Sequence, residues 1–104
     1  MRPTRHRIVI QPAAIEDLDQ IMAYIAEHSP LNAATLIDRI LNRIRTLATL
    51  PRRCPYAREN GAFPEELRQL VVGSYRVIFT VQKREVHVLR VRHAARQPLG
   101  RDDL

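Results

Sequence analysis

Apolar residues recur with the spacing of an α-helix in two stretches of the first half of the chain. The first stripe consists of Ile15, Leu18, Ile21, Met22 and Ile25. The second consists of Ala33, Ile37, Ile40, Leu41, Ile44 and Leu47. Because a proline fits the first turn of a helix, we expect helices to begin at Pro12 and, after a Ser29 cap, at Pro30. Pro51 ends the second pattern near Leu50, and the very short link predicts an antiparallel helical hairpin.

Alternating polar and apolar positions predict four short strands around these helices. Residues 5–10 form the first, and residues 67–72, 75–82 and 85–92 form the other three. The last three strands are joined by two-residue links, the length that tight hairpins use. The order β-α-α-β-β-β therefore predicts an α+β fold, in which an N-terminal strand precedes a helical hairpin packed on an antiparallel sheet.

The length and composition are those of one folded domain. The chain has 104 residues, of which 45% are hydrophobic and 27% charged. We expect a single domain over residues 1–104, with an ordered core over about 5–96 and a less ordered tail over about 97–104. No apolar run approaches the ~18 residues of a membrane span, and the basic start lacks the apolar stretch of a signal peptide. The predicted location is the cytoplasm, without a membrane partner.

Basic residues are concentrated in the last third of the chain. The whole chain carries 17 Lys and Arg against 11 Asp and Glu, a net charge of +6. Residues 67–101 hold eight basic residues and one acid, Glu85, which is a net charge of +7. Such a surface suits a polyanion or an acidic protein partner, and an ordinary solvated basic face is the alternative.

The sequence offers little for metal, cofactor or nucleophilic chemistry. Its four histidines lack the spacing of metal ligands, its single cysteine forms no CxxC pair, and its three glycines form no phosphate-binding loop. Cys54 stands beside Arg52 and Arg53, which would lower the pKa of its thiol, but its place in a loop between prolines is that of a bystander. We expect no metal site and no cofactor.

The remaining candidates are basic residues on and after the predicted strands. They are Arg68, Arg76, Arg90, Arg92, His93 and Arg96. Alternation places Tyr75 and Phe79 on the sheet face that the helices cover, and Arg76 on the opposite face. That opposite face is either a basic platform for phosphate binding or phosphodiester cleavage, or an ordinary solvated face. His93 and Arg96 are the strongest functional pair, since core packing does not explain them.

Four segments in this order resemble the ParE branch of the ParE/RelE toxins. They are A..DL..I..YI over residues 14–25, A..L...I...I..L...P ending at Pro51, LR.L.VGSYRVIF.V over 67–81 and V.VLRVRHAAR over 86–96. No single motif is decisive, but together they span nearly the whole chain. The ParE/RelE proteins are the toxins of type II toxin–antitoxin modules, often described as plasmid stabilisation proteins.

This resemblance implies a partner. Toxins of this family are neutralised by a cognate antitoxin, here a ParD-like protein whose acidic, amphipathic C-terminal segment lies across the helical hairpin and the sheet. The expected assembly is a toxin–antitoxin hetero-oligomer. A disordered acidic segment that folds on a basic surface agrees with the charge of the last third of the chain.

The resemblance also implies a choice between two targets. ParE-like toxins poison DNA gyrase and block replication, whereas RelE-like toxins cut mRNA on the ribosome. The nuclease branch tends to carry paired lysines before the GSYR-like motif, an arginine within it and a tyrosine near the C-terminus. Here Arg76 fills the arginine position, but Leu67 and Gln69 stand in place of the lysines and no tyrosine follows Tyr75.

The ending RVRHAAR is also closer to that of ParE. We therefore favour a gyrase poison that is not itself an enzyme. The alternative is a ribosome-dependent mRNA endoribonuclease in which Arg76, His93 and Arg96 stabilise charge and transfer a proton. A third hypothesis is a small basic binding module without toxicity.

Overall fold

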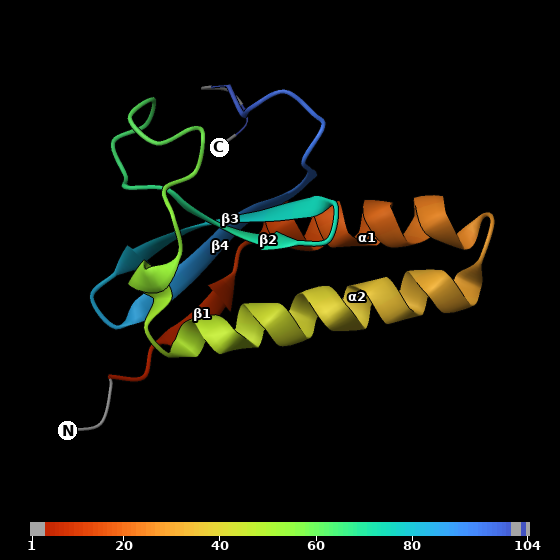
Figure 1. The fold of residues 1–104 in the computed structure, drawn as a ribbon, viewed down its shortest axis with the longest axis horizontal. Coiled ribbons are helices and arrows are strands. Elements are labelled where there is room, and N and C mark those ends of the chain that lie inside the picture. Colours follow the sequence, from red (N-terminus) through yellow and green to blue (C-terminus); the bar gives the residue numbers. More distant parts are fainter. Residues whose placement is uncertain (1–3, 101–102, 104) are drawn as a thin grey trace.

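The fold is a four-stranded sheet with a helical hairpin on one face (Figure 1). The structure is a computed structural model, which describes residues 4–100 and 103. Its elements are β1 (Arg7–Ile10), α1 (Pro12–Ala26), α2 (Pro30–Arg45), the 3-10 turns η1 (Thr46–Ala48) and η2 (Pro51–Arg53), β2 (Arg68–Val72), β3 (Tyr75–Gln82) and β4 (Glu85–His93). The predicted α+β class and the order β-α-α-β-β-β are confirmed.

The strands lie in the order β1-β4-β3-β2. The last three form the expected antiparallel meander, and β1 joins β4 in parallel, with Arg7 opposite Glu85 and Ile10 opposite Val88. A parallel neighbour needs a long crossover, which the helical hairpin provides. Because β1 pairs only with residues 85–88, the second half of β4 has no strand on that side in the described part of the chain.

The helices begin where the sequence predicts and one of them ends earlier. Ser29 caps α2, since its side-chain oxygen accepts the backbone N–H of Asn32 at 3.2 Å. The regular helix ends at Arg45, short of the expected end near Leu50, and continues as η1. The apolar pattern does not indicate where the regular helix ends, because the η1 residues Leu47 and Ala48 are also buried.

The helix-covered face holds the main core. Its largest fully buried side chains include Phe79 on β3 and Ile40 and Ile44 on α2. As alternation predicts, Phe79 lies on this face, and Tyr75 packs against the same cluster. No helix within residues 4–100 is long and apolar enough to cross a bilayer.

The opposite face differs from the expectation of an open platform or a solvated surface. A second buried cluster covers it, formed by Ala57, Leu67, Ile78 and Leu99. The loop between η2 and β2 and the segment after β4 therefore lie across the sheet (Figure 1). This cover buries Arg76 on β3, whose exposed fraction is 2%.

Candidate functional site

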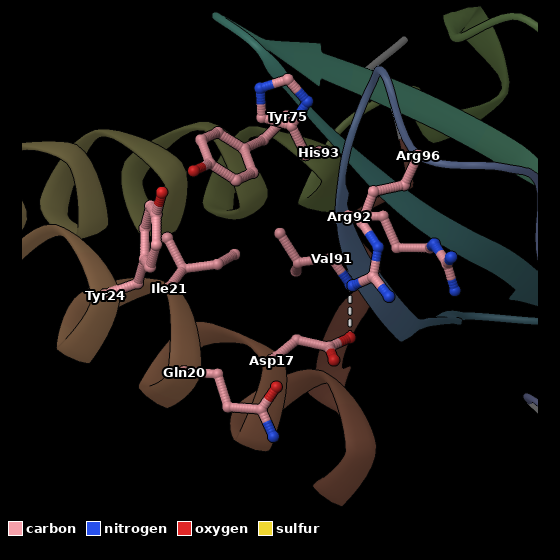
Figure 2. Close-up of a pocket in the computed structure, with 9 residues that line it drawn as sticks. All are labelled: Asp17, Gln20, Ile21, Tyr24, Tyr75, Val91, Arg92, His93 and Arg96. Atoms are coloured by element: carbon pink, nitrogen blue, oxygen red, sulfur yellow. Dashed lines mark hydrogen bonds between the residues drawn. The ribbon is translucent and has the colours of Figure 1, made fainter.

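A pocket of about 440 Å³ opens where α1 passes the C-terminal end of β4 (Figure 2). Its lining residues are Asp17, Gln20, Ile21, Tyr24, Tyr75, Val91, Arg92, His93 and Arg96. Three of the six basic residues singled out in the sequence therefore meet here. The pocket combines aromatic rings, aliphatic side chains and positive charge in one hollow.

Asp17 fixes the wall of the pocket by joining α1 to β4. Its carboxylate accepts the backbone N–H of Val91 at 2.9 Å, and the Nε and Nη2 of Arg90 at 2.7 and 2.9 Å. The Val91 N–H points to the edge of β4 that β1 leaves without a partner strand. These hydrogen bonds tie β4 to α1, and they raise the pKa of Arg90.

Two arginines contribute to the lining of the pocket, the exposed Arg96 and the buried Arg92. Arg92 is 8% exposed, and its Nε has no hydrogen-bond partner within the described residues. Burial lowers the pKa of Arg92, and the nearby guanidinium of Arg96 lowers it further. The carboxylate of Asp17 also lines the pocket, but Arg90 and the N–H of Val91 already engage it, so the exposed guanidinium of Arg96 favours an anionic ligand.

The aromatic side of the pocket is built from Tyr24, Tyr75 and His93. The rings of Tyr75 and His93 meet edge to face, with their centroids 5.3 Å apart. The Nδ1 of His93 accepts the backbone N–H of Ala95 at 3.0 Å, which leaves Nε2 to carry the proton of the neutral ring. Tyr24 is 70% exposed and stands on α1 opposite Tyr75 (Figure 2). This wall suits an apolar or aromatic side chain of a partner.

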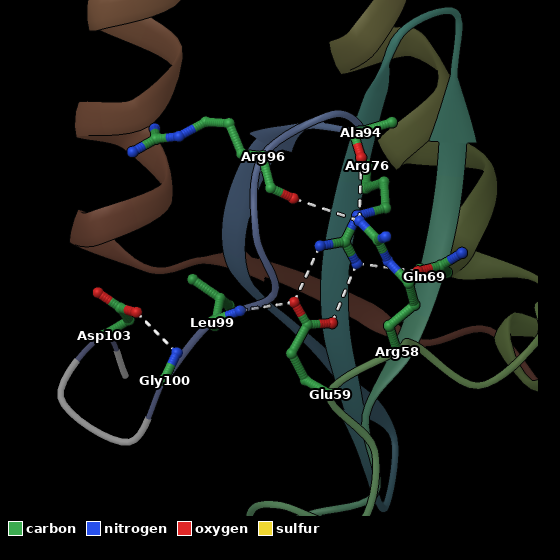
Figure 3. A network of polar contacts seen from close by, with 9 residues as sticks. All are labelled: Arg58, Glu59, Gln69, Arg76, Ala94, Arg96, Leu99, Gly100 and Asp103. Carbon is green, nitrogen blue, oxygen red and sulfur yellow. Dashed lines mark hydrogen bonds and ion pairs between the residues drawn. The ribbon is translucent and has the colours of Figure 1, made fainter.

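Arg76 belongs to a separate, buried network on the other face of the sheet (Figure 3). Its Nη1 and Nη2 donate to the two carboxylate oxygens of Glu59 at 3.0 and 2.9 Å, and Nη1 also donates to Gln69 at 3.0 Å. The same carboxylate accepts the backbone N–H of Leu99 at 2.9 Å. Burial alone raises the pKa of Glu59, but the bonds from Arg76 and Leu99 outweigh it and lower the pKa to about 2.

Arg68 is also occupied by contacts within the fold. Its guanidinium lies 4.5 Å from the centre of the Tyr56 ring, forms an ion pair with Glu66 at 3.0 Å and donates to the carbonyl oxygen of Cys54 at 2.6 Å. The structure thus brings Arg92, His93 and Arg96 together. It places Arg68, Arg76 and Arg90 in three other environments.

The α1 side of the pocket was not among the candidates that the sequence indicates. Asp17, Gln20, Ile21 and Tyr24 follow one another at intervals of three, one and three residues, which puts them on one helix face. A polar residue and an exposed tyrosine within that face are the signal that could have identified it. What the sequence lacks is the information that this face meets the end of β4.

Cys54 does not line the pocket, and its thiol is not activated for reaction. Cys54 is 6% exposed, and burial raises the pKa of its thiol although Arg53 and Arg68 act in the opposite direction. A buried, protonated thiol is a poor nucleophile. Within the part of the chain that the structure describes, no three His, Cys, Asp or Glu side chains converge as metal ligands do.

Solved structures share this fold. The chromosomal ParDE toxin–antitoxin system from P. aeruginosa matches with a TM-score of 0.71 and 20% identity, over 86% of this chain and 97% of that one. The toxin–antitoxin complex RelBE2 from Mycobacterium tuberculosis matches with a TM-score of 0.59 and 19% identity, over 92% and 97%. The protein therefore has the fold of the RelE/ParE toxins.

The sequence defines the family more closely. Residues 8–98 match the family described as the ParE toxin of the type II toxin–antitoxin system parDE. Toxin RelE2 from Caulobacter vibrioides is 37% identical over 84 residues, which are 80% of this chain and 89% of that protein. The chain belongs to the ParE toxin family of type II toxin–antitoxin systems, as the four sequence segments indicated.

Proposed function

We propose that this toxin poisons DNA gyrase and blocks replication as a single-domain, cytoplasmic binding protein that is not itself an enzyme. The observation that carries this proposal is the burial of Arg76. A ribonuclease of this fold would need that arginine at the scissile phosphate, where it stabilises developing charge. In this chain the side chain of Arg76 is 3% exposed and already bound by Glu59 and Gln69, on a different face from His93.

The proposed neutralising partner is a ParD-like antitoxin with an acidic, amphipathic C-terminal segment, which binds in a toxin–antitoxin hetero-oligomer. The pocket supplies the exposed Arg96 for a carboxylate of such a segment. Large apolar side chains on the hairpin supply the rest of the surface, namely Ile15, Met22, Tyr24 and Leu31, which are 39–76% exposed. The similar M. tuberculosis structure is itself a toxin–antitoxin complex.

Ribosome-dependent mRNA cleavage is the second candidate function. The observation in its favour is that His93 and Arg96 line one pocket, where an imidazole would transfer a proton and a guanidinium would stabilise charge.

The test begins with tightly controlled expression in a bacterial host, followed by incorporation of labelled thymidine and labelled methionine. A gyrase poison stops thymidine incorporation first, and the purified protein then stabilises the cleaved gyrase–DNA complex. Arg96→Gln is expected to weaken both effects, while Arg45→Gln, an exposed arginine at the end of α2, keeps them.

The contrary result is equally clear. Early loss of methionine incorporation, together with mRNA cleavage in a ribosome-containing extract that His93→Ala abolishes, would replace gyrase poisoning by the nuclease function.

A further inference from the structure

A second hollow, of about 590 Å³, lies at the other end of β4 from the candidate site. It is bounded by Thr4 and His6, just before β1, by the segment Leu50–Arg52 and by the turn Lys83–Arg84 between β3 and β4. The nine residues of β4 separate the two hollows by roughly 30 Å. One ligand group cannot contact both hollows, so a ligand of the second hollow would bind independently of the candidate site.

Its rim carries positive charge that the fold does not neutralise. Arg52, Lys83 and Arg84 are exposed, and their side chains form no hydrogen bond or ion pair within the described residues. No acidic side chain lines the hollow. The nearest acid along the chain is Glu85, which is already engaged by Arg7 and His87. Three cations therefore face solvent around one concave surface, which favours binding of an anion.

The hollow is held in shape by hydrogen bonds between its three segments. The backbone N–H of His6 donates to the carbonyl oxygen of Ala48 at 2.7 Å, and the N–H of Arg7 donates to that of Arg84 at 2.7 Å. In addition, the Nδ1 of His6 is buried without a partner in the described part of the chain. Because this nitrogen is itself buried, a ligand in the hollow would contact the remainder of the His6 ring.

Backbone strain is concentrated at the same place. Leu50 and Lys83 have φ values of 50° and 56°, and no other residue except glycine has a positive φ within the described residues. Each such conformation costs about 1 kcal/mol or more and persists only where the surrounding structure imposes it. Both residues line this hollow.

We propose that this hollow binds a phosphate group of a nucleic-acid strand. Guanidinium and ammonium groups are the usual donors to phosphate oxygens. Leu50, which is 58% exposed, and Pro51 provide an apolar surface beside the cations, against which a sugar or base can lie. The partner is thus recognised by its combination of an anionic backbone with apolar rings.

An acidic peptide is less well suited to the same hollow. Peptides commonly bind a basic surface by extending a sheet through a free strand edge. Here β4 begins between β1 and β3, and the N–H of His6 is paired with Ala48. The hollow therefore presents side chains rather than a free strand edge to a ligand. Contacts from side chains to phosphates are the commonest contacts of nucleic-acid binding.

The test measures the binding of a short fluorescent oligonucleotide, single-stranded and duplex, to the purified full chain at several salt concentrations. Lys83→Gln and Arg84→Gln are each expected to lower affinity about 3–10-fold and to reduce the slope of log affinity against log salt by about 1. Arg39→Gln is the matched control, because it removes one exposed charge from the middle of α2 and leaves affinity nearly unchanged.

Two further measurements separate binding from folding and locate the oligonucleotide on the protein. Lys83→Gly loses the charge at a positive φ that glycine adopts freely, so affinity falls while the thermal midpoint does not. In NMR spectra the oligonucleotide shifts the ring signals of His6 and leaves those of His28, at the far end of α1, in place.

The proposal is overturned if Lys83→Gln and Arg84→Gln bind as well as the unchanged protein, or if Arg39→Gln weakens binding to the same degree. It is also overturned if only inorganic phosphate or polyglutamate occupies the hollow. Since the assay contains neither gyrase nor ribosomes, its outcome is independent of the proposed function.

Discussion

Glu59 and Arg76 form a buried two-point ion pair, with nitrogen–oxygen distances of 3.0 and 2.9 Å. Glu59 belongs to the loop before β2 and Arg76 to β3, so the pair fastens the loop to the sheet. The N–H of Leu99 donates to the same carboxylate, which fastens the segment after β4 as well (Figure 3). One side chain therefore holds three parts of the chain together.

Replacing this carboxylate should strongly destabilise the protein. Glu59→Gln leaves the charge of Arg76 buried without a counterion and is expected to cost about 3–5 kcal/mol of the free energy of unfolding. Urea unfolding followed by circular dichroism measures the loss. Glu65→Gln, an exposed neighbour in the same loop, is the control and should change little. Equal effects of the two changes would contradict the role of the ion pair.

The same pair predicts a dependence of stability on acid. Because the pKa of Glu59 is about 2 in the folded protein and 4.5 for an unperturbed glutamate, the unfolded chain takes up the proton first as pH falls. The stabilisation is complete above pH 4.5 and is lost progressively towards pH 2, by about 3 kcal/mol in total. Urea midpoints across this range test the prediction. A double variant, Glu59→Leu with Arg76→Leu, should lose this part of the pH dependence.

Asp17 should stabilise the contact between α1 and β4. Asp17→Asn keeps an oxygen for the N–H of Val91 but loses the ion pair with Arg90, at an expected cost of about 1–3 kcal/mol. Hydrogen exchange at the Val91 amide should accelerate together with this loss. Asp19→Asn, on the exposed side of the same helix, serves as the control. If Val91 exchanges at the same rate in both variants, Asp17 does not hold this edge.

Two exposed tyrosines allow a matched test of the pocket as the antitoxin contact. Tyr24 lines the pocket and is 70% exposed, whereas Tyr56 is 54% exposed and stacks against Arg68. Tyr24→Ala is expected to weaken binding of the antitoxin at least 10-fold, as loss of an aromatic anchor does, without altering the thermal midpoint. Isothermal titration calorimetry with Tyr56→Ala as control measures this. Similar losses in both variants would place the contact elsewhere.

The thiol of Cys54 should react slowly. It is buried, and burial raises its pKa, so little thiolate is present and access is limited. Labelling with a thiol reagent is expected to be slow in buffer and fast in denaturant, with the rate following unfolding. Rapid labelling of the folded protein would show that Cys54 is accessible after all.

Local pattern was sufficient for most of the fold. The apolar stripes identify both helices because every third or fourth side chain of a helix meets the same neighbour. Strand β3 was predicted at its observed bounds, Tyr75–Gln82, since Tyr75, Val77, Phe79 and Val81 alternate in the sequence, although both faces of the strand are covered in the structure. The end of α2 was not predicted, because Leu47 remains buried in the 3-10 turn that follows.

The site was predicted in part. His93 and Arg96 were singled out because nothing in the core required them, and both line the pocket. Tyr24 on α1 escaped notice, because a tyrosine in an apolar stripe looks the same whether it packs inward or faces a partner. The environment of Arg76 also differed from the expected open face, since the loop that covers it carries no regular pattern.

The sequence by itself determined the elements, their order and the family, because these depend on residues close together in the chain and on the order of four motifs. Only the tertiary structure decided which charges are available. Arg76 is bound to Glu59, 17 positions away, and Arg90 to Asp17, 73 positions away. Whether an arginine is buried with a carboxylate or open to a partner depends on which distant segments the sheet order brings together, and no local pattern records that.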